Sequence, residues 1–148
     1  MRYLTLFVFI LLSGCLSKDQ EIAKSDIKIE NIRHSQDMYG GEKIYNANLM
    51  STHSLKKIAE DNSYPVSKII CSDEKYKITG GIDLDTEEKI INNYKYSIHI
   101  TICENENCNV DIENKKIKAA CTVELTKNYS NQKYSTNITF LNQHNFTK

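Results

Sequence analysis

The chain has 148 residues, and its 19 basic and 19 acidic residues balance to a formal net charge of zero. A chain of this length predicts one domain with a modest hydrophobic core rather than two. The charges of both signs are mixed along the sequence and form no basic patch, which argues against nucleic acid as a partner.

The first fifteen residues have the pattern of an export signal. Met1-Arg2-Tyr3 is followed by the apolar run Leu4 to Leu12 and then by Leu12-Ser13-Gly14-Cys15. One positive charge, an apolar run of about nine residues and a junction of small residues are typical of a cleaved signal peptide, and the run is too short to cross a bilayer of about 30 Å. The segment Leu-Ser-Gly-Cys resembles the lipobox of bacterial lipoproteins. An ordinary secretory signal that happens to end at cysteine is the alternative.

The resemblance implies processing and location but no fold. It predicts a signal peptide over residues 1–14 and acylation of Cys15, so that the lipid bilayer is a partner of the chain. In lipoproteins of this kind an aspartate after the cysteine favours the inner membrane, and Leu16 stands there instead. We therefore expect anchoring in the outer membrane on its periplasmic face. Residues 15–36 are predicted to be a polar tether that ends in an edge strand, and residues 37–148 a single domain.

Within that domain one helix is expected first. Leu49, Leu55, Ile58 and Ala59 fall roughly on one helical face, Ser51 or Thr52 can cap the start, and Pro65 follows the end.

After Pro65 the apolar period changes to two, which is typical of strands. Residues 94–103 and 116–125 alternate most clearly, and residues 66–71, 76–84 and 134–140 are further predicted strands, the second with a bulge or bend at Gly80-Gly81. The short connections favour antiparallel pairing. We therefore predict a mainly β (α+β) fold, an antiparallel meander or curled sheet with one short helix, cross-linked by disulfides.

Four cysteines remain after Cys15, and an even number in an exported domain predicts two disulfides. Four cysteines allow three pairings. We favour Cys103 with Cys108, across a polar turn that precedes a return strand at Val110 and Ile112, and Cys71 with Cys121. A zinc site is the rival interpretation, but the spacing from Cys103 to Cys108 is wider than that of usual paired zinc ligands, and no close histidine pair accompanies it.

Few residues suggest chemistry, and we predict no catalytic residue, no metal and no cofactor. The four histidines lie far apart, and His99 is expected on the solvated face of its strand. The acidic run Asp83 to Glu88 resembles a calcium loop in part, but it lacks the required glycine and final glutamate, which favours a solvated turn. Tyr94 and Tyr96 are expected in the core, whereas Tyr129 and Tyr134 are candidates for an exposed interface.

The sequence therefore predicts a lipid-anchored protein of the outer membrane that faces the periplasm and binds a protein partner. The preferred role is that of an inhibitor or immunity factor against an envelope-attacking enzyme. The alternative is an assembly or pilot lipoprotein of a secretion, pilus or conjugation apparatus. An envelope enzyme is the third class, and it would require His99 or a pair of carboxylates to lie in a pocket.

Overall fold

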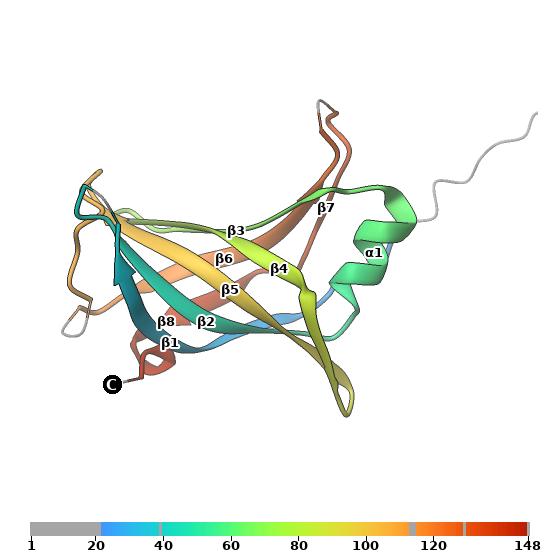
Figure 1. Ribbon diagram of the computed structural model, residues 1–148, viewed down its shortest axis with the longest axis horizontal. Coiled ribbons are helices and arrows are strands. Elements are labelled where there is room, and N and C mark those ends of the chain that lie inside the picture. Colours follow the sequence, from blue (N-terminus) through green and yellow to red (C-terminus); the bar gives the residue numbers. More distant parts are fainter. Residues whose placement is uncertain (1–21, 39, 113–114, 129, 148) are drawn as a thin grey trace, which may run out of the picture.

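A computed structural model describes residues 22–38, 40–112, 115–128 and 130–147 of the chain. Strands make up most of this part, with one α-helix (Figure 1). The elements in order are β1 (Ile27–Asp37), β2 (Lys43–Ser51), α1 (Leu55–Asn62), β3 (Val66–Ser72), β4 (Tyr76–Ile90), β5 (Asn93–Glu104), β6 (Lys118–Thr126), β7 (Lys133–Ser135), β8 (Thr139–Asn142) and a short 3-10 turn (Gln143–Asn145).

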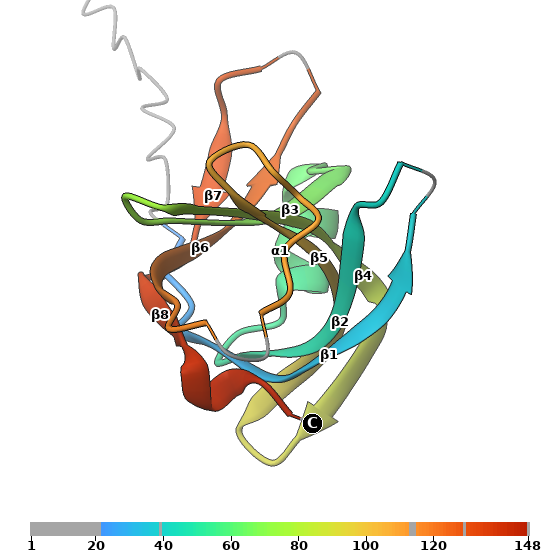
Figure 2. The ribbon, with the colours of Figure 1, turned by 90° about the vertical axis from the view of Figure 1, so that its left-hand side faces the viewer.

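The strands form one antiparallel sheet in the order β1-β2-β5-β4-β3-β6-β7, and β8 also pairs with β6. The view in Figure 2 shows that the sheet curls, so that its strands surround the core on several sides. The mainly β prediction and its curled-sheet form are thus confirmed. The order is not that of a meander, because β2 pairs with β5 rather than with β3.

Strand β5 shows most clearly why the sequence forms this sheet. Tyr96, Ile98, Ile100 and Ile102 are buried, whereas the residues between them point outward. Because successive side chains of a strand point to opposite faces, this alternation places one apolar face inside the curl. Full burial of each isoleucine stabilises the fold by about 1.5–3 kcal/mol.

The two ends of the curled sheet are joined by hydrogen bonds of side chains and of the backbone. The Ser25 backbone amide donates to the Tyr134 hydroxyl at 2.6 Å, and the Asn145 side-chain amide donates to the carbonyl of Ile29. The Thr147 backbone amide donates to the carbonyl of Ile32 at 3.0 Å. These bonds connect residues near both ends of the described chain, so the seam of the sheet closes between β1 and the segment around β7 and β8.

The expected helix is present but shorter than predicted. Leu49 belongs to strand β2, where it is buried, and the helix begins only at Leu55. The cap is Ser54 rather than Ser51 or Thr52, because the Ser54 hydroxyl accepts a hydrogen bond from the Lys57 backbone amide at 2.9 Å. The prediction of one short helix is confirmed, and its predicted start is wrong.

Strand β1 starts at Ile27, inside the predicted tether, so the edge strand expected there is present, and it contributes buried side chains to the core. Two other expectations differ from the structure. The strand expected over residues 134–140 is divided into β7 and β8. Val110 and Ile112 are buried without forming the expected return strand.

The predicted bulge at Gly80-Gly81 is also absent, because pairing of these residues with β5 continues without a shift. The close approach of strand β5 explains why position 80 is a glycine. A Cβ atom there would lie 2.0 Å from the carbonyl oxygen of His99. The register shift between β4 and β5 lies instead between Asp83 and Glu88. The acidic segment from Asp83 to Glu88, which was expected to form a turn, is therefore an irregular part of strand β4.

Candidate functional site

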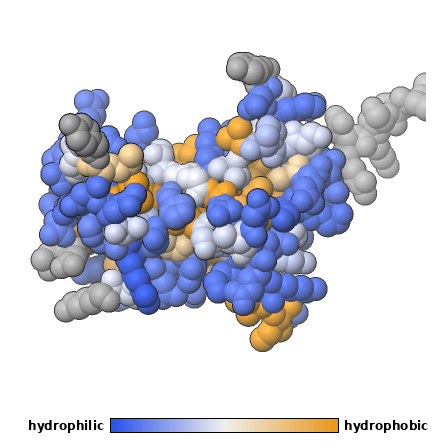
Figure 3. All heavy atoms as spheres, viewed as in Figure 1, coloured by the Kyte–Doolittle hydropathy of each residue, from blue (hydrophilic) through white to orange (hydrophobic). Residues whose placement is uncertain are grey.

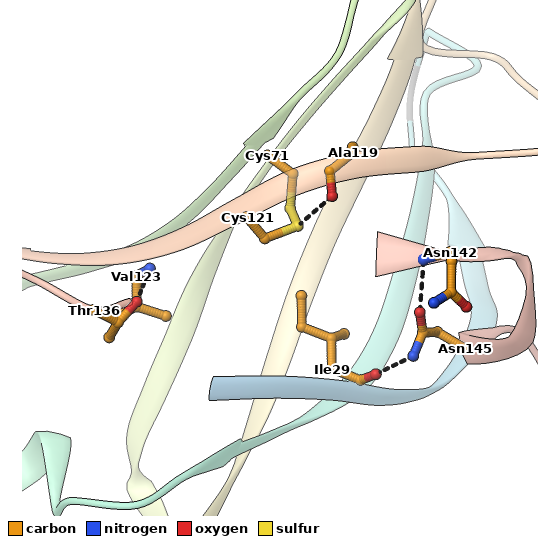
Figure 4. Close-up of a disulfide and its surroundings, with 8 residues drawn as sticks. All are labelled: Ile29, Cys71, Ala119, Cys121, Val123, Thr136, Asn142 and Asn145. Atoms are coloured by element: carbon orange, nitrogen blue, oxygen red, sulfur yellow. Dashed lines mark hydrogen bonds between the residues drawn. A yellow bond between two sulfur atoms is a disulfide. The ribbon is translucent and has the colours of Figure 1, made fainter. Parts of the chain in front are cut away.

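Both disulfides have the favoured pairing. Cys71 is joined to Cys121 and Cys103 to Cys108. Cys71 and Cys121 face each other on the neighbouring strands β3 and β6 and are fully buried, close to the seam residues (Figure 4). The predicted lipid site, Cys15, lies outside the described residues. The disulfides therefore stabilise the fold, and the candidate functional surface lies elsewhere on the molecule.

The hairpin of β4 and β5 is the most prominent candidate surface. Strand β3 pairs with β4 only as far as Gly81, and β2 pairs with β5 only as far as Tyr94. The end of the hairpin is therefore paired only within itself, and it extends beyond the sheet (Figure 1). In Figure 3, hydrophobic atoms protrude at the place where Figure 1 draws this end.

Ile91 stands at the tip of the hairpin. Its side chain is 86% exposed, the largest value among the exposed large apolar side chains of the described residues. Ile90 pairs with Asn93, so Ile91 and Asn92 form a two-residue turn, and Ile91 has a φ of 49°. A β-branched residue at positive φ is an outlier, and turns of this kind prefer glycine or asparagine there. The backbone of the tip is thus strained at Ile91. The apolar side chain of this residue is exposed and does not pack in the core.

The base of the hairpin is fixed to helix α1 by a partly buried hydrogen-bond network. The Tyr96 hydroxyl accepts from the Leu55 backbone amide at 2.8 Å and donates to the Glu87 carboxylate. The same carboxylate oxygen accepts from the Ser54 hydroxyl at 2.7 Å. Because one carboxylate joins β4, β5 and the helix N-terminus, the hairpin is held in a defined orientation.

Substitution of Tyr96 by phenylalanine tests this network. We expect Tyr96→Phe to lower the free energy of unfolding by about 1–3 kcal/mol at neutral pH, because the Leu55 amide loses its acceptor in a buried place. Burial raises the pKa of the Tyr96 hydroxyl above its ordinary value, and the hydrogen bond to Glu87 raises it further. The native state then keeps a proton that an unfolded tyrosine releases near pH 10.

The stabilisation from this hydroxyl is therefore complete below about pH 10 and decreases as the pH rises above that value. Urea unfolding of both proteins at several pH values, followed by circular dichroism, measures the difference. The advantage of the wild type over Tyr96→Phe should shrink at alkaline pH, and an advantage that is constant up to pH 11 would contradict the assigned role.

The other residues considered from the sequence lie apart from this network. Tyr134 is buried, and its hydroxyl donates to the carbonyl of Ala23 at 3.0 Å, so its predicted exposure is wrong. The residues next to Tyr134 in sequence are polar. Its hydrogen-bond partners lie more than one hundred residues away, so no local pattern indicated that it is buried. Tyr129 lies outside the described residues. Tyr94 is half-buried against the core, and Tyr96 is fully buried, as expected for both.

His99 points outward from β5 as predicted, and it lines a groove of about 410 Å³ on the outer face of β1, β2 and β5. Its Nδ1 atom lies 2.7 Å from the amide oxygen of Asn46 on β2. The sequence did not reveal this groove, because strand β5 contributes to it together with β1 and β2, which lie far before β5 in the chain.

A second groove, of about 640 Å³, lies between α1 and β4, and the Lys56 ammonium group pairs with the Asp85 carboxylate at its edge, at 2.9 Å. Among the described residues no group of three or more histidine, cysteine, aspartate or glutamate side chains could hold a metal ion. No helix of the described part is both long and apolar enough to span a membrane. Comparison of the chain with protein-family models, with curated proteins and with solved structures finds no match.

Proposed function

We propose that this chain is a lipid-anchored protein of the outer membrane that faces the periplasm, binds a protein partner and blocks it, as an inhibitor or immunity factor does. The observation that carries the proposal is the exposure of Ile91 at the end of a hairpin that extends beyond its neighbours. The lipobox-like segment that ends at Cys15 supports the anchoring.

A protein partner fits this surface because the hairpin is convex and its tip is apolar. A few side chains that enter well-packed pockets of the partner contribute most of the binding energy in many interfaces. The orientation of the hairpin is already fixed through Glu87 and Tyr96. Binding therefore loses less conformational entropy than it would with a mobile loop. A narrow cleft, such as the substrate cleft of an enzyme, is the complementary shape.

The hairpin tip and the start of the described chain lie on different sides of the curled sheet. The Ser25 backbone amide bonds to Tyr134 on β7, at one end of the sheet order, whereas β4 and β5 lie in its middle. Figure 2 shows β7 and the hairpin of β4 and β5 on opposite sides of the curled sheet. Figure 1 places the start of the described chain and the end of this hairpin at the same end of the molecule, so the two are separated around the sheet rather than along its long axis.

Photo-crosslinking in intact cells tests the proposal. A benzophenone amino acid replaces Ile91 in one variant and Ile138 in a matched control, since Ile138 is also an exposed isoleucine, at 67%, but lies between β7 and β8. We expect one dominant protein adduct from position 91, recovered with the membrane fraction, and little or none from position 138.

The identity of the adduct separates the roles. An exported hydrolase or toxin would support the inhibitor or immunity role, whereas several subunits of one envelope apparatus would replace it with the assembly role. Equal labelling from both positions, or no adduct from either, would contradict binding through the hairpin.

A further inference from the structure

The groove that contains His99 has a chemistry that the hairpin does not explain. It lies over the outer face of β1, β2 and β5, and its rim includes Asn31, Arg33, Asn46, Asn48 and His99. Strand β1 is irregular here, with a register shift between Glu30 and Arg33 and a φ of 55° at Asn31. The volume of about 410 Å³ lies within the range of about 300–1,000 Å³ that small-molecule sites occupy.

Arg33 supplies the positive charge of the groove. Apart from Arg2 it is the only arginine of the chain. Its Nε atom donates to the Thr147 hydroxyl at 3.0 Å, and Thr147 is itself bonded through its backbone amide to the carbonyl of Ile32. Within the described part of the chain, no carboxylate lies at ion-pair distance from Arg33, and no acidic side chain lines the groove. A guanidinium group held in this way offers its terminal nitrogens to a carboxylate.

Asn46 and His99 supply a neutral pair beside that charge. With the Asn46 oxygen accepting from the His99 Nδ1–H group at 2.7 Å, the Asn46 Nδ2 hydrogens and the His99 Nε2 lone pair are left for other partners. This cross-strand pair of β2 and β5 then offers one donor and one acceptor. Two neighbouring hydroxyl groups of a sugar match this arrangement, because one can accept while the other donates.

We propose that this groove binds a sugar that carries a carboxylate, with Arg33 pairing with the carboxylate and Asn46 and His99 bonding neighbouring hydroxyls. Because Arg33 has no acidic partner within the described residues, the groove favours a ligand with a carboxylate. The donor of Asn46 and the acceptor of His99 favour a ligand that also carries hydroxyl groups, rather than a simple organic acid. The groove is exposed and polar, so the affinity for a single sugar is weak, and the proposal does not depend on the partner of the hairpin.

Calorimetric titration of the full-length protein in detergent micelles tests the proposal, with glucuronate, its neutral counterpart glucose, and acetate as probes. We expect glucuronate to bind in the millimolar range and at least about tenfold more tightly than either glucose or acetate. Arg33→Gln should reduce the affinity for glucuronate about tenfold. Asn46→Ala should weaken both sugars and leave acetate unchanged.

Lys77→Gln is the matched control, because Lys77 is an exposed residue of β4 and its replacement removes the same charge away from the groove. It should leave all affinities unchanged. The proposal is overturned if Arg33→Gln and Lys77→Gln have equal effects, if acetate binds as tightly as glucuronate, or if glucuronate does not bind the wild type. Circular dichroism of each variant checks that it is folded, so that a loss of binding can be assigned to the groove.

Discussion

Replacement of Gly80 by alanine is expected to destabilise the protein by about 3 kcal/mol or more. The added Cβ atom would lie 2.0 Å from the His99 carbonyl oxygen and 2.9 Å from the His99 carbonyl carbon. These are backbone atoms of the paired strand β5, so no side-chain rotation relieves the contact, and the two central strands must separate locally.

Gly81→Ala is the matched control for this substitution. No heavy atom lies within 4 Å of a Cβ atom built at Gly81, and its φ is not in the positive range. We expect a change within about 0.5 kcal/mol. Urea unfolding followed by tyrosine fluorescence compares the two variants, since the chain has nine tyrosines and no tryptophan. Similar losses in both variants would show that the close approach of β4 and β5 at Gly80 is not as described.

Removal of the buried disulfide is expected to have the largest effect on stability. The sequence separation between Cys71 and Cys121 is 50 residues, and in the chain-entropy model a loop of this size stabilises the native state by about 4 kcal/mol. We therefore expect the double variant Cys71→Ala, Cys121→Ala to melt more than about 10 °C below the wild type. The fully buried position of both cysteines adds a packing loss.

The second disulfide provides the comparison. Cys103 and Cys108 are separated by only 5 residues, for which the same model gives about 2 kcal/mol. Calorimetric melting of the variant Cys103→Ala, Cys108→Ala should show a smaller decrease than that of the buried pair. If the two double variants melt at the same temperature, loop size does not govern the contribution of these bonds.

The elements predicted best were those whose signal is local. In β5 and β6 the apolar residues alternate over the whole strand, and the buried faces are those expected. The polar turn between Cys103 and Cys108 favoured their pairing and left Cys71 for Cys121, and the structure has both bonds.

The missed elements depend on competing or distant signals. Strand β2 alternates through Tyr45, Ala47 and Leu49, but Leu49 also continues the helical spacing of Leu55 and Ile58. Period two prevailed because β2 is hydrogen-bonded to β1 along one edge and to β5 along the other, and its alternate side chains then face the core. The groove around Arg33 was not predicted, since it depends on the irregularity in β1 and on the order of the strands. The exposure of Ile91 was not predicted either, since it depends on how far β2 and β3 extend along the hairpin.

The bonds that close the sheet have a consequence for the order of folding. Ile29 and Asn145 are 116 residues apart, and Ser25 and Tyr134 are 109 apart. Contacts this distant in sequence are associated with slow folding, because the entropy of loop closure is lost before the contact forms. The bond between Ile29 and Asn145 cannot form until the C-terminal residues of the chain are available. Strand β1 can pair with β2, its neighbour in sequence, before that point. The contact between β1 and the C-terminal segment is therefore the step that closes the sheet last.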